Sequence, residues 1–194
     1  MAKTAQFDRQ AVVDKAMNLY WAKGFHATSM RDLQNEIDLR PGSIYSAFGS
    51  KDGLFKESLR HYADMGLAQI RGFATEYESP LAALKGFVKA QVIETLTDAP
   101  NGTCMLCKTL SELTAENQEL IDATKRYFGE IAAEISALVR QAQELGEVSA
   151  SQDAEEIAEH VQIQIAGLRA FAKINNDKAV LDSKIESMFG HYPF

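Results

Sequence analysis

The sequence predicts an all-α protein with about nine helices. Apolar residues recur at the helical spacing of roughly 3.6 along nearly all of the 194 residues, and no segment sustains the alternation of a strand. The breaks between these segments carry residues that start and stop helices, chiefly Ser, Asp, Pro and Gly. Hydrophobic residues make up 46% and charged residues 24% of the chain, a balance that allows a sizeable core.

The first helix is expected to begin after Asp8, whose carboxylate can cap it, and to end at Gly24. Its apolar residues are expected to be buried. They are Val12, Val13, Ala16, Met17, Leu19 and Tyr20.

Two short helices follow, joined by a tight turn. Ser29 can cap the first of them, and Asp32, three residues later, completes a pattern that resembles a capping box. Asp38 falls where a left-handed turn residue is needed, a conformation that Asp tolerates better than most residues. Pro41 suits the first turn of the second short helix, which is expected to end at residues 49–50.

The rest of the chain is also expected to be helical. A cap at Ser50 starts a long helix, and the stretch Asp-Ala-Pro-Asn-Gly at residues 98–102 is the clearest break. Gly146 ends the longest amphipathic segment. The expected helices are residues 51–77, 80–97, 104–113, 114–145, 153–175 and 178–189.

The net charge of −7 is distributed unevenly. Residues 1–60 hold 9 Lys and Arg against 7 Asp and Glu, whereas residues 61–194 hold 11 against 20. Attraction to phosphate decays over about 10 Å at moderate salt, so local charge matters more than the total. A mildly basic N-terminal segment in front of an acidic body is therefore compatible with DNA binding.

Residues 24–55 carry the strongest functional signal. Two short helices held at a fixed angle can place the second in the major groove of DNA. Residues 42–55 add the combination Gly-Ser-Ile-Tyr-x-x-Phe-x-Ser-Lys-x-x-Leu-Phe. With this combination, residues 8–55 resemble the DNA-binding domain of the tetracycline-repressor (TetR) family. The sequence departs from the usual family pattern at Gln34, Asp38 and Pro41.

The resemblance implies a DNA-binding domain at residues 1–50 and a helical ligand-sensing and dimerisation domain at residues 51–194. It also implies a regulator, most simply a repressor, that binds a palindromic double-stranded DNA operator as a homodimer and is released by a small-molecule inducer. The ligand would act by swinging the long fourth helix and changing the distance between the two DNA-binding heads.

The second short helix should bury Ile44 and Phe48, which share one face, and turn its other sides toward DNA. Small residues permit close approach, hydroxyl groups can bond bases or phosphates, and an alanine can meet a thymine methyl group. Free N–H groups at helix starts and basic side chains can bind phosphate. The expected contacts are Thr28, Ser29, Arg31, Arg40, Pro41, Gly42, Ser43, Tyr45, Ser46, Ala47 and Lys51.

One such head would bind weakly, so the chain is expected to dimerise. The resemblance implies that the last two helices form the interface. Their apolar residues could supply that surface or belong to the core. They are Ile157, Val161, Ile165, Leu168, Phe171, Ile185 and Phe189.

The implied ligand pocket has four candidate lining residues, all of which could equally be core. They are Phe87, Met105, Tyr127 and Phe171. The acidic body hints at a cationic ligand, although a solvated acidic surface explains the same charge.

Cys104 and Cys107 form a Cys-x-x-Cys pair at the expected start of a helix. Because helix N-termini lower thiol pKa values, one of them could be a reactive thiolate in an oxidant or electrophile sensor. Inert buried thiols are the alternative. A zinc site would need about two more ligands, and the four histidines are scattered, so no metal or cofactor is expected.

Two other functions compete with the regulator. A thiol redox enzyme lacks support, since the chain has no nucleotide-binding loop, catalytic triad or carboxylate pair, and no enzyme activity is expected. The second competing function is a helical interaction module that does not bind DNA, and it does not explain the Gly-Ser-Ile-Tyr motif at residues 42–45 or the Ser-Lys pair at residues 50–51. No run approaches the roughly 18 apolar residues that span a bilayer, and no signal-peptide core is present, so a cytoplasmic location without a membrane partner is expected.

Overall fold

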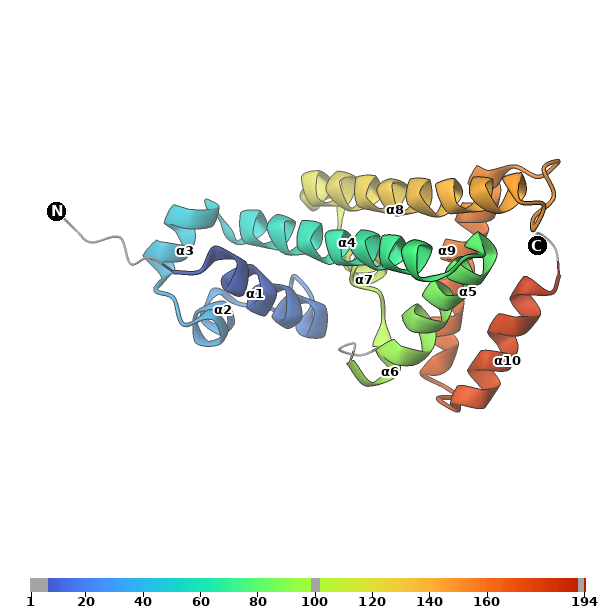
Figure 1. The fold of residues 1–194 in the computed structure, drawn as a ribbon. Coiled ribbons are helices and arrows are strands. Elements are labelled where there is room, and N and C mark those ends of the chain that lie inside the picture. Colours follow the sequence, from blue (N-terminus) through green and yellow to red (C-terminus); the bar gives the residue numbers. More distant parts are fainter. Residues whose placement is uncertain (1–6, 99–101, 192–193) are drawn as a thin grey trace.

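In the computed structural model, residues 7–98, 102–191 and 194 are described. Within them every regular element is a helix, which confirms the all-α prediction (Figure 1). The α-helices are α1 (Arg9–Lys23), α2 (Met30–Ile37), α3 (Pro41–Phe48), α4 (Lys51–Glu76), α5 (Pro80–Lys89), α6 (Thr95–Asp98), α7 (Met105–Glu112), α8 (Gln118–Glu144), α9 (Ala154–Ala172) and α10 (Lys178–Phe189). None of the described helices has the length and apolar character needed to cross a membrane.

The predicted helix starts are formed by local side-chain contacts. Asp8 accepts hydrogen bonds from the backbone N–H groups of Gln10 and Ala11. Ser29 and Asp32 form the full capping box of α2. Asp38 lies in the left-handed region at φ 54° and ψ 42°, as the turn between α2 and α3 requires.

Two segments differ from the expected helices. The helix expected over residues 80–97 is continuous from α5 to α6 but contains a π-helical segment, η1 (Ala90–Glu94). The helix expected from residue 114 begins only at Gln118, after a 3-10 turn, η3 (Ala115–Asn117). Leu113 and Thr114 are extended and Thr114 makes no side-chain cap, which delays the start of α8.

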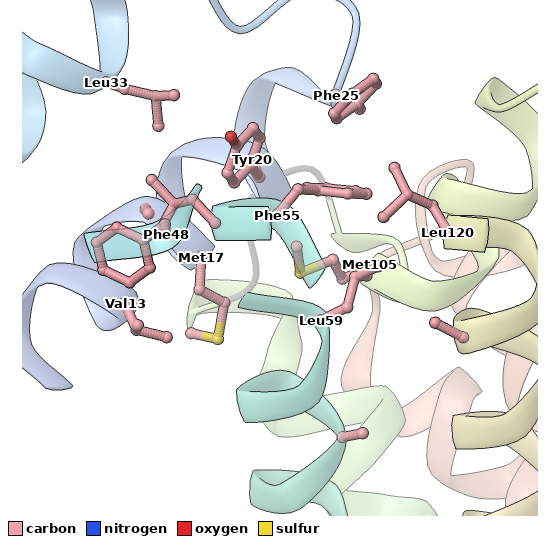
Figure 2. Packing of buried hydrophobic residues seen from close by; sticks show 14 of the residues in the cluster. Val13, Met17, Tyr20, Phe25, Leu33, Phe48, Phe55, Leu59, Met105 and Leu120 are labelled. Atoms are coloured by element: carbon pink, nitrogen blue, oxygen red, sulfur yellow. The ribbon is translucent and has the colours of Figure 1, made fainter. Parts of the chain in front are cut away.

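The N-terminal helices share a core with the body of the protein. Tyr20 and Phe25 pack on Phe55, with ring centroids 4.7 and 4.9 Å away, and Figure 2 shows Phe55 between Tyr20 and Leu120 of α8. Met105 of α7 belongs to the same cluster. A second cluster joins the C-terminal part of α4 to α5, α8, α9 and α10. Helix α4 therefore belongs to both cores and links α1–α3, at one end of the molecule, to α9 and α10 at the other, with α8 running alongside it (Figure 1).

Several residues considered for a dimer surface lie in the second core instead. Ile157, Val161, Ile185 and Phe189 are buried against α4, α5 and α8, because their helix faces point inward. The exposed apolar side chains in this region are different ones: Ile163 of α9 is 68% exposed, and Ile174, in the turn that follows α9, is 85% exposed.

Candidate nucleic-acid interface and ligand cavity

Helix α3 presents one face to the solvent and buries the other. Ile44 and Phe48 are buried in the first core, as predicted. Tyr45 is 50% exposed, and Pro41, Gly42 and Ser46 are exposed. A Cβ atom added to Gly42 would meet no atom within 4 Å, so this part of the surface is open. Ser43 and Ala47 are half-buried at the edges of the exposed face.

A basic side chain that the sequence reading did not select fixes the position of α3. The guanidinium of Arg9 donates to Ala47 O at 3.0 Å and lies 4.4 Å from the centroid of the Phe48 ring. The same group makes a two-pronged contact with the carboxylate of Glu57 in α4, at 3.2 and 2.5 Å. These contacts join α1, α3 and α4, because a guanidinium can bond in several directions at once.

The expected phosphate ligands around α3 divide into two groups. Arg31 and Arg40 are exposed, and their side chains form no hydrogen bond or ion pair with the described residues. Ser29 is exposed at the start of α2, where its hydroxyl serves the capping box with Asp32. All three residues precede α3 in the sequence by a few positions, and they remain candidates for DNA contacts.

Thr28 and Lys51 are directed inward, in contrast to the expectation for their side chains. Thr28 is fully buried, and its hydroxyl donates to Gly24 O at 2.6 Å, so it is not available to a phosphate. The ammonium of Lys51 donates to Phe25 O at 2.6 Å and lies 4.3 Å from the Phe25 ring centroid. Burial lowers the pKa of Lys51. Both side chains stabilise the turn between α1 and α2.

Helix α7 holds the end of α1 from the side of the body. Lys108 Nζ donates to the carbonyl oxygens of Trp21 and Ala22, at 3.0 and 2.8 Å, where a cation is favoured by the helix dipole. The carboxylate of Glu112 accepts from the backbone N–H groups of Phe25 and His26. The sequence carried no signal for these contacts, because more than 80 residues separate the partners.

A cavity of about 440 Å³ lies between α1, α4, the α5–α6 segment, α7, α8 and α9. Of the four predicted lining residues, only Phe87 reaches it. Met105 and Tyr127 are buried in the first core, and Phe171 packs against the second. These three side chains pack in or against the cores and do not line the cavity, so their assignment as lining residues is corrected.

A polar network occupies part of the cavity wall. Arg169 of α9 is 3% exposed, and its guanidinium donates to Gly102 O at 3.2 Å and to Gln91 Oε1 at 3.4 Å. Gln91 in turn donates to Gln69 Oε1 at 2.6 Å. Gln91 lies in the π-helical segment η1, a type of irregularity that often occurs at functional sites.

Cys104 and Cys107 both line this cavity and are not joined by a disulfide. Hydrogen bonding from the Cys107 thiol is the main cause that lowers the pKa of Cys104, against the opposing effect of burial. The nearby Arg169 guanidinium lowers the pKa further. The pKa of Cys107 is raised, first because its proton is held in that hydrogen bond. The direction of these shifts favours the thiolate at Cys104 over that at Cys107.

The architecture defines a class of protein. A helix-turn-helix with an open second helix, packed on a helical body that encloses a cavity, is the arrangement of a DNA-binding transcriptional regulator. Residues 12–58 match the family described as bacterial regulatory proteins, tetR family, and residues 80–188 match the tetracyclin repressor-like C-terminal domain. The chain belongs to the TetR family, and the regulatory function expected from its sequence is confirmed.

Individual relatives are similar over much of the chain. The transcriptional repressor ComR of Escherichia coli K12 is 27% identical over 86% of this chain and 80% of its own length. The regulator RutR of the same strain is 25% identical over 59% of this chain and 57% of its own length. A solved structure of a CifR cysteine mutant with 26-bp double-strand operator DNA has a TM-score of 0.87 at 27% identity, covering 99% of this chain and 100% of that one.

Proposed function

We propose that this regulator is a homodimeric repressor that binds a two-fold-related operator through α3 and is released by a small molecule in the cavity. Residues 1–50 would form the DNA-binding domain, and residues 51–194 the sensing and dimerisation domain. The operator complex of the similar CifR mutant supports this assignment. A paired site gives each weak head a partner, which raises affinity and fixes the half-site spacing.

The open face of α3 is the observation that carries the proposal. Gly42 permits close approach to the groove, while Ser43 and Ser46 supply hydroxyl groups for base edges or phosphates. Tyr45 extends from the same helix with half of its surface exposed. Further residues would flank this contact. They are Pro41 and Ala47 of α3, Arg31 and Arg40, and Ser29 at the start of α2. Thr28 is left out because its hydroxyl is buried, and Lys51 would act only through its charge.

The dimer interface of the proposal centres on α9, with α10 beside it. Three exposed residues recur at helical spacing along α9: Ile163, Gly167 and Ala170. The exposed side chain of Ile174 follows in the turn just after the helix. Such an apolar stripe on the surface favours association with a second copy of the chain.

The cavity and the DNA-binding head are connected through α7. Cys104, Leu106 and Cys107 line the cavity, while Lys108 and Glu112 of the same helix hold the end of α1. A ligand that prefers a displaced α7 would thereby change the position of the head relative to α4. Release from DNA follows only if the ligand binds that displaced state more tightly.

The test is binding of the full chain to DNA that flanks its own coding region, followed by footprinting and titration with salt. A repressor of this kind protects a short palindrome and loses affinity steeply as salt rises, because phosphate contacts release counterions. Protection of a single half-site by a monomer, or no protection at all, would contradict the proposal.

Thiol sensing is the second candidate, and the lowered pKa of Cys104 at the cavity wall favours it. In this version Cys104 Sγ, after losing its proton, adds to the C=C bond of an electrophile such as a maleimide. An S–C bond forms, the C=C double bond becomes a single bond, and the neighbouring carbon takes up a proton. Alternatively, the two thiols form a disulfide and pass two electrons and two protons to hydrogen peroxide, whose O–O bond breaks to give two water molecules. Replacing both cysteines by serine would abolish release of DNA by N-ethylmaleimide or hydrogen peroxide. Unchanged release would remove this candidate.

A further inference from the structure

Arg169 is the one charged residue among the described residues that line the cavity. Two of its nitrogens have acceptors, Gly102 O and Gln91 Oε1, but Nη2 has no hydrogen-bond partner in the described chain. A buried cation without full pairing is costly, since it has lost its hydration without gaining a counter-charge. The cavity therefore contains a donor that is positioned for a bound group with negative charge.

The guanidinium is held in place by its neighbours. Gln91 accepts from Arg169 with its amide oxygen and donates to Gln69 with its amide nitrogen, so the chain of hydrogen bonds fixes the orientation of both groups. The π-helical segment η1 carries Gln91. A donor fixed in this way loses little conformational entropy when a ligand binds.

The remaining walls limit what the ligand can be. They are mostly apolar and aromatic. They include Met17, Trp21, Phe87, Phe128, Ile131 and Ile165. The volume of about 440 Å³ falls within the usual range of small-molecule sites. A fitting ligand has an apolar body and one anionic group, because a second charge would find no partner among the lining residues.

Cys104 also interacts with Arg169, whose charge contributes to the lowered pKa of this thiol, so Cys104 could be thought to satisfy the guanidinium. Within the described residues, however, neither thiol forms a hydrogen bond with Arg169, and Nη2 is left unpaired. Cys104 therefore leaves the hydrogen-bonding capacity of Nη2 unused. A carboxylate, which matches the planar fork of a guanidinium with two parallel hydrogen bonds, is the better partner.

We propose that the cavity binds an amphipathic organic monocarboxylate, with the carboxylate on Arg169 and the apolar body against Trp21, Phe87 and Phe128. This rests on the proposed function, in which the cavity is the inducer site. The acidic composition of the body suggested a cationic ligand, but the lining residues decide the local charge, and their one charge is positive.

The test is calorimetric titration of the full-length protein with matched acids and amides, naphthalene-1-acetate with naphthalene-1-acetamide and decanoate with decanamide. Each pair has the same shape and differs in charge. In the unmodified protein the carboxylate binds about 10- to 100-fold more tightly than its amide, the range expected for a charge-assisted bidentate contact. Arg169→Gln removes this preference, and Arg169→Lys keeps part of it. Arg71→Gln, which removes an exposed arginine outside the cavity, leaves it unchanged.

Three results would overturn the inference. They are equal affinity for acid and amide, a preference that survives Arg169→Gln, or a preference that disappears in Cys104→Ser. If neutral compounds bind and release the operator DNA without an acid preference, the monocarboxylate assignment fails while the inducer cavity stands. If no compound binds and none changes affinity for the operator, the assignment of the cavity as a sensor fails as well. The comparison of acid with amide requires no variant, so it remains decisive even if Arg169→Gln does not fold.

Discussion

Glu112 Oε1 lies 2.7 Å from the backbone nitrogen of His26, although 86 residues separate the two in sequence. The second carboxylate oxygen accepts from the backbone N–H of Phe25. These bonds satisfy two backbone N–H groups in the turn that follows α1. The carboxylate lies so close to this turn that a Cβ added to Gly24 would be 2.4 Å from Glu112 Oε2. The position of the DNA-binding head is therefore partly determined by a residue of the body.

Glu112→Ala should destabilise the protein by about 1–3 kcal/mol, because two backbone donors lose a charged acceptor. It should also weaken operator binding, since the head is no longer held at one angle. Urea denaturation and mobility-shift titration measure the two effects. Glu116→Ala is the control, because Glu116 is an exposed acidic residue in η3 whose side chain forms no hydrogen bond or ion pair with the described residues of the head. Equal behaviour of the two variants would mean that the contact has no influence on the head.

Tyr45→Ala should weaken operator binding by about 1–3 kcal/mol without changing the unfolding midpoint, because the side chain is exposed and its proposed role is a DNA contact. Tyr77→Ala is the matched control, since Tyr77 is 40% exposed at the end of α4, away from α3. Mobility-shift titrations at one salt concentration compare the variants. If Tyr45→Ala binds as the unmodified protein does, Tyr45 does not contact DNA.

Ile163→Glu combined with Ile174→Glu should convert the dimer to monomers at micromolar concentration, since two charges would enter an apolar contact. Sedimentation equilibrium measures the change. Leu145→Glu is the control, because Leu145 is 64% exposed at the end of α8 and lies outside the proposed stripe. A double variant that remains dimeric would move the interface away from this face of α9.

The pH dependence of thiol alkylation should differ from that of an ordinary cysteine. The pKa of Cys104 is lowered, so its thiolate persists below the usual range of about 8.5 and is lost only as the pH falls through the lowered value. Its rate with iodoacetamide, followed by peptide mass spectrometry, should thus stay high under mildly acidic conditions. Cys107→Ala removes the main cause of the shift, so the profile should move to higher pH. A profile with its midpoint in the ordinary range would show that the pair does not share a proton in this way.

The helices and their ends could be predicted because the signals are local. Ser29 and Asp32 are three residues apart, and Asp38 and Pro41 mark the turn between α2 and α3 within a few residues. The exposed face of α3 followed from the spacing of Ile44 and Phe48.

The cavity could not be predicted, because its polar wall joins Gln69, Gln91 and Arg169, which lie far apart in sequence on three different elements. Periodicity identifies apolar residues but not which of them face a neighbouring helix and which face a void. The sequence therefore could not show that Met105 and Tyr127 pack in the first core whereas Phe87 lines the cavity. The burial of polar side chains could not be predicted either. Thr28 is buried, but the sequence around a helix start does not show whether a threonine there is buried or exposed.

Trp21, the only tryptophan of the chain, connects these features. Its indole N–H donates to Thr103 O at 2.6 Å, its ring meets the Tyr62 ring edge-on at 5.0 Å, and it lines the cavity at the end of the helix that α7 holds. The protein thus carries its single tryptophan fluorophore at the junction of sensor and head. The emission wavelength and intensity of Trp21 therefore report, without any label, both ligand binding in the cavity and displacement of α7 from α1. Stopped-flow mixing can establish which of the two events comes first.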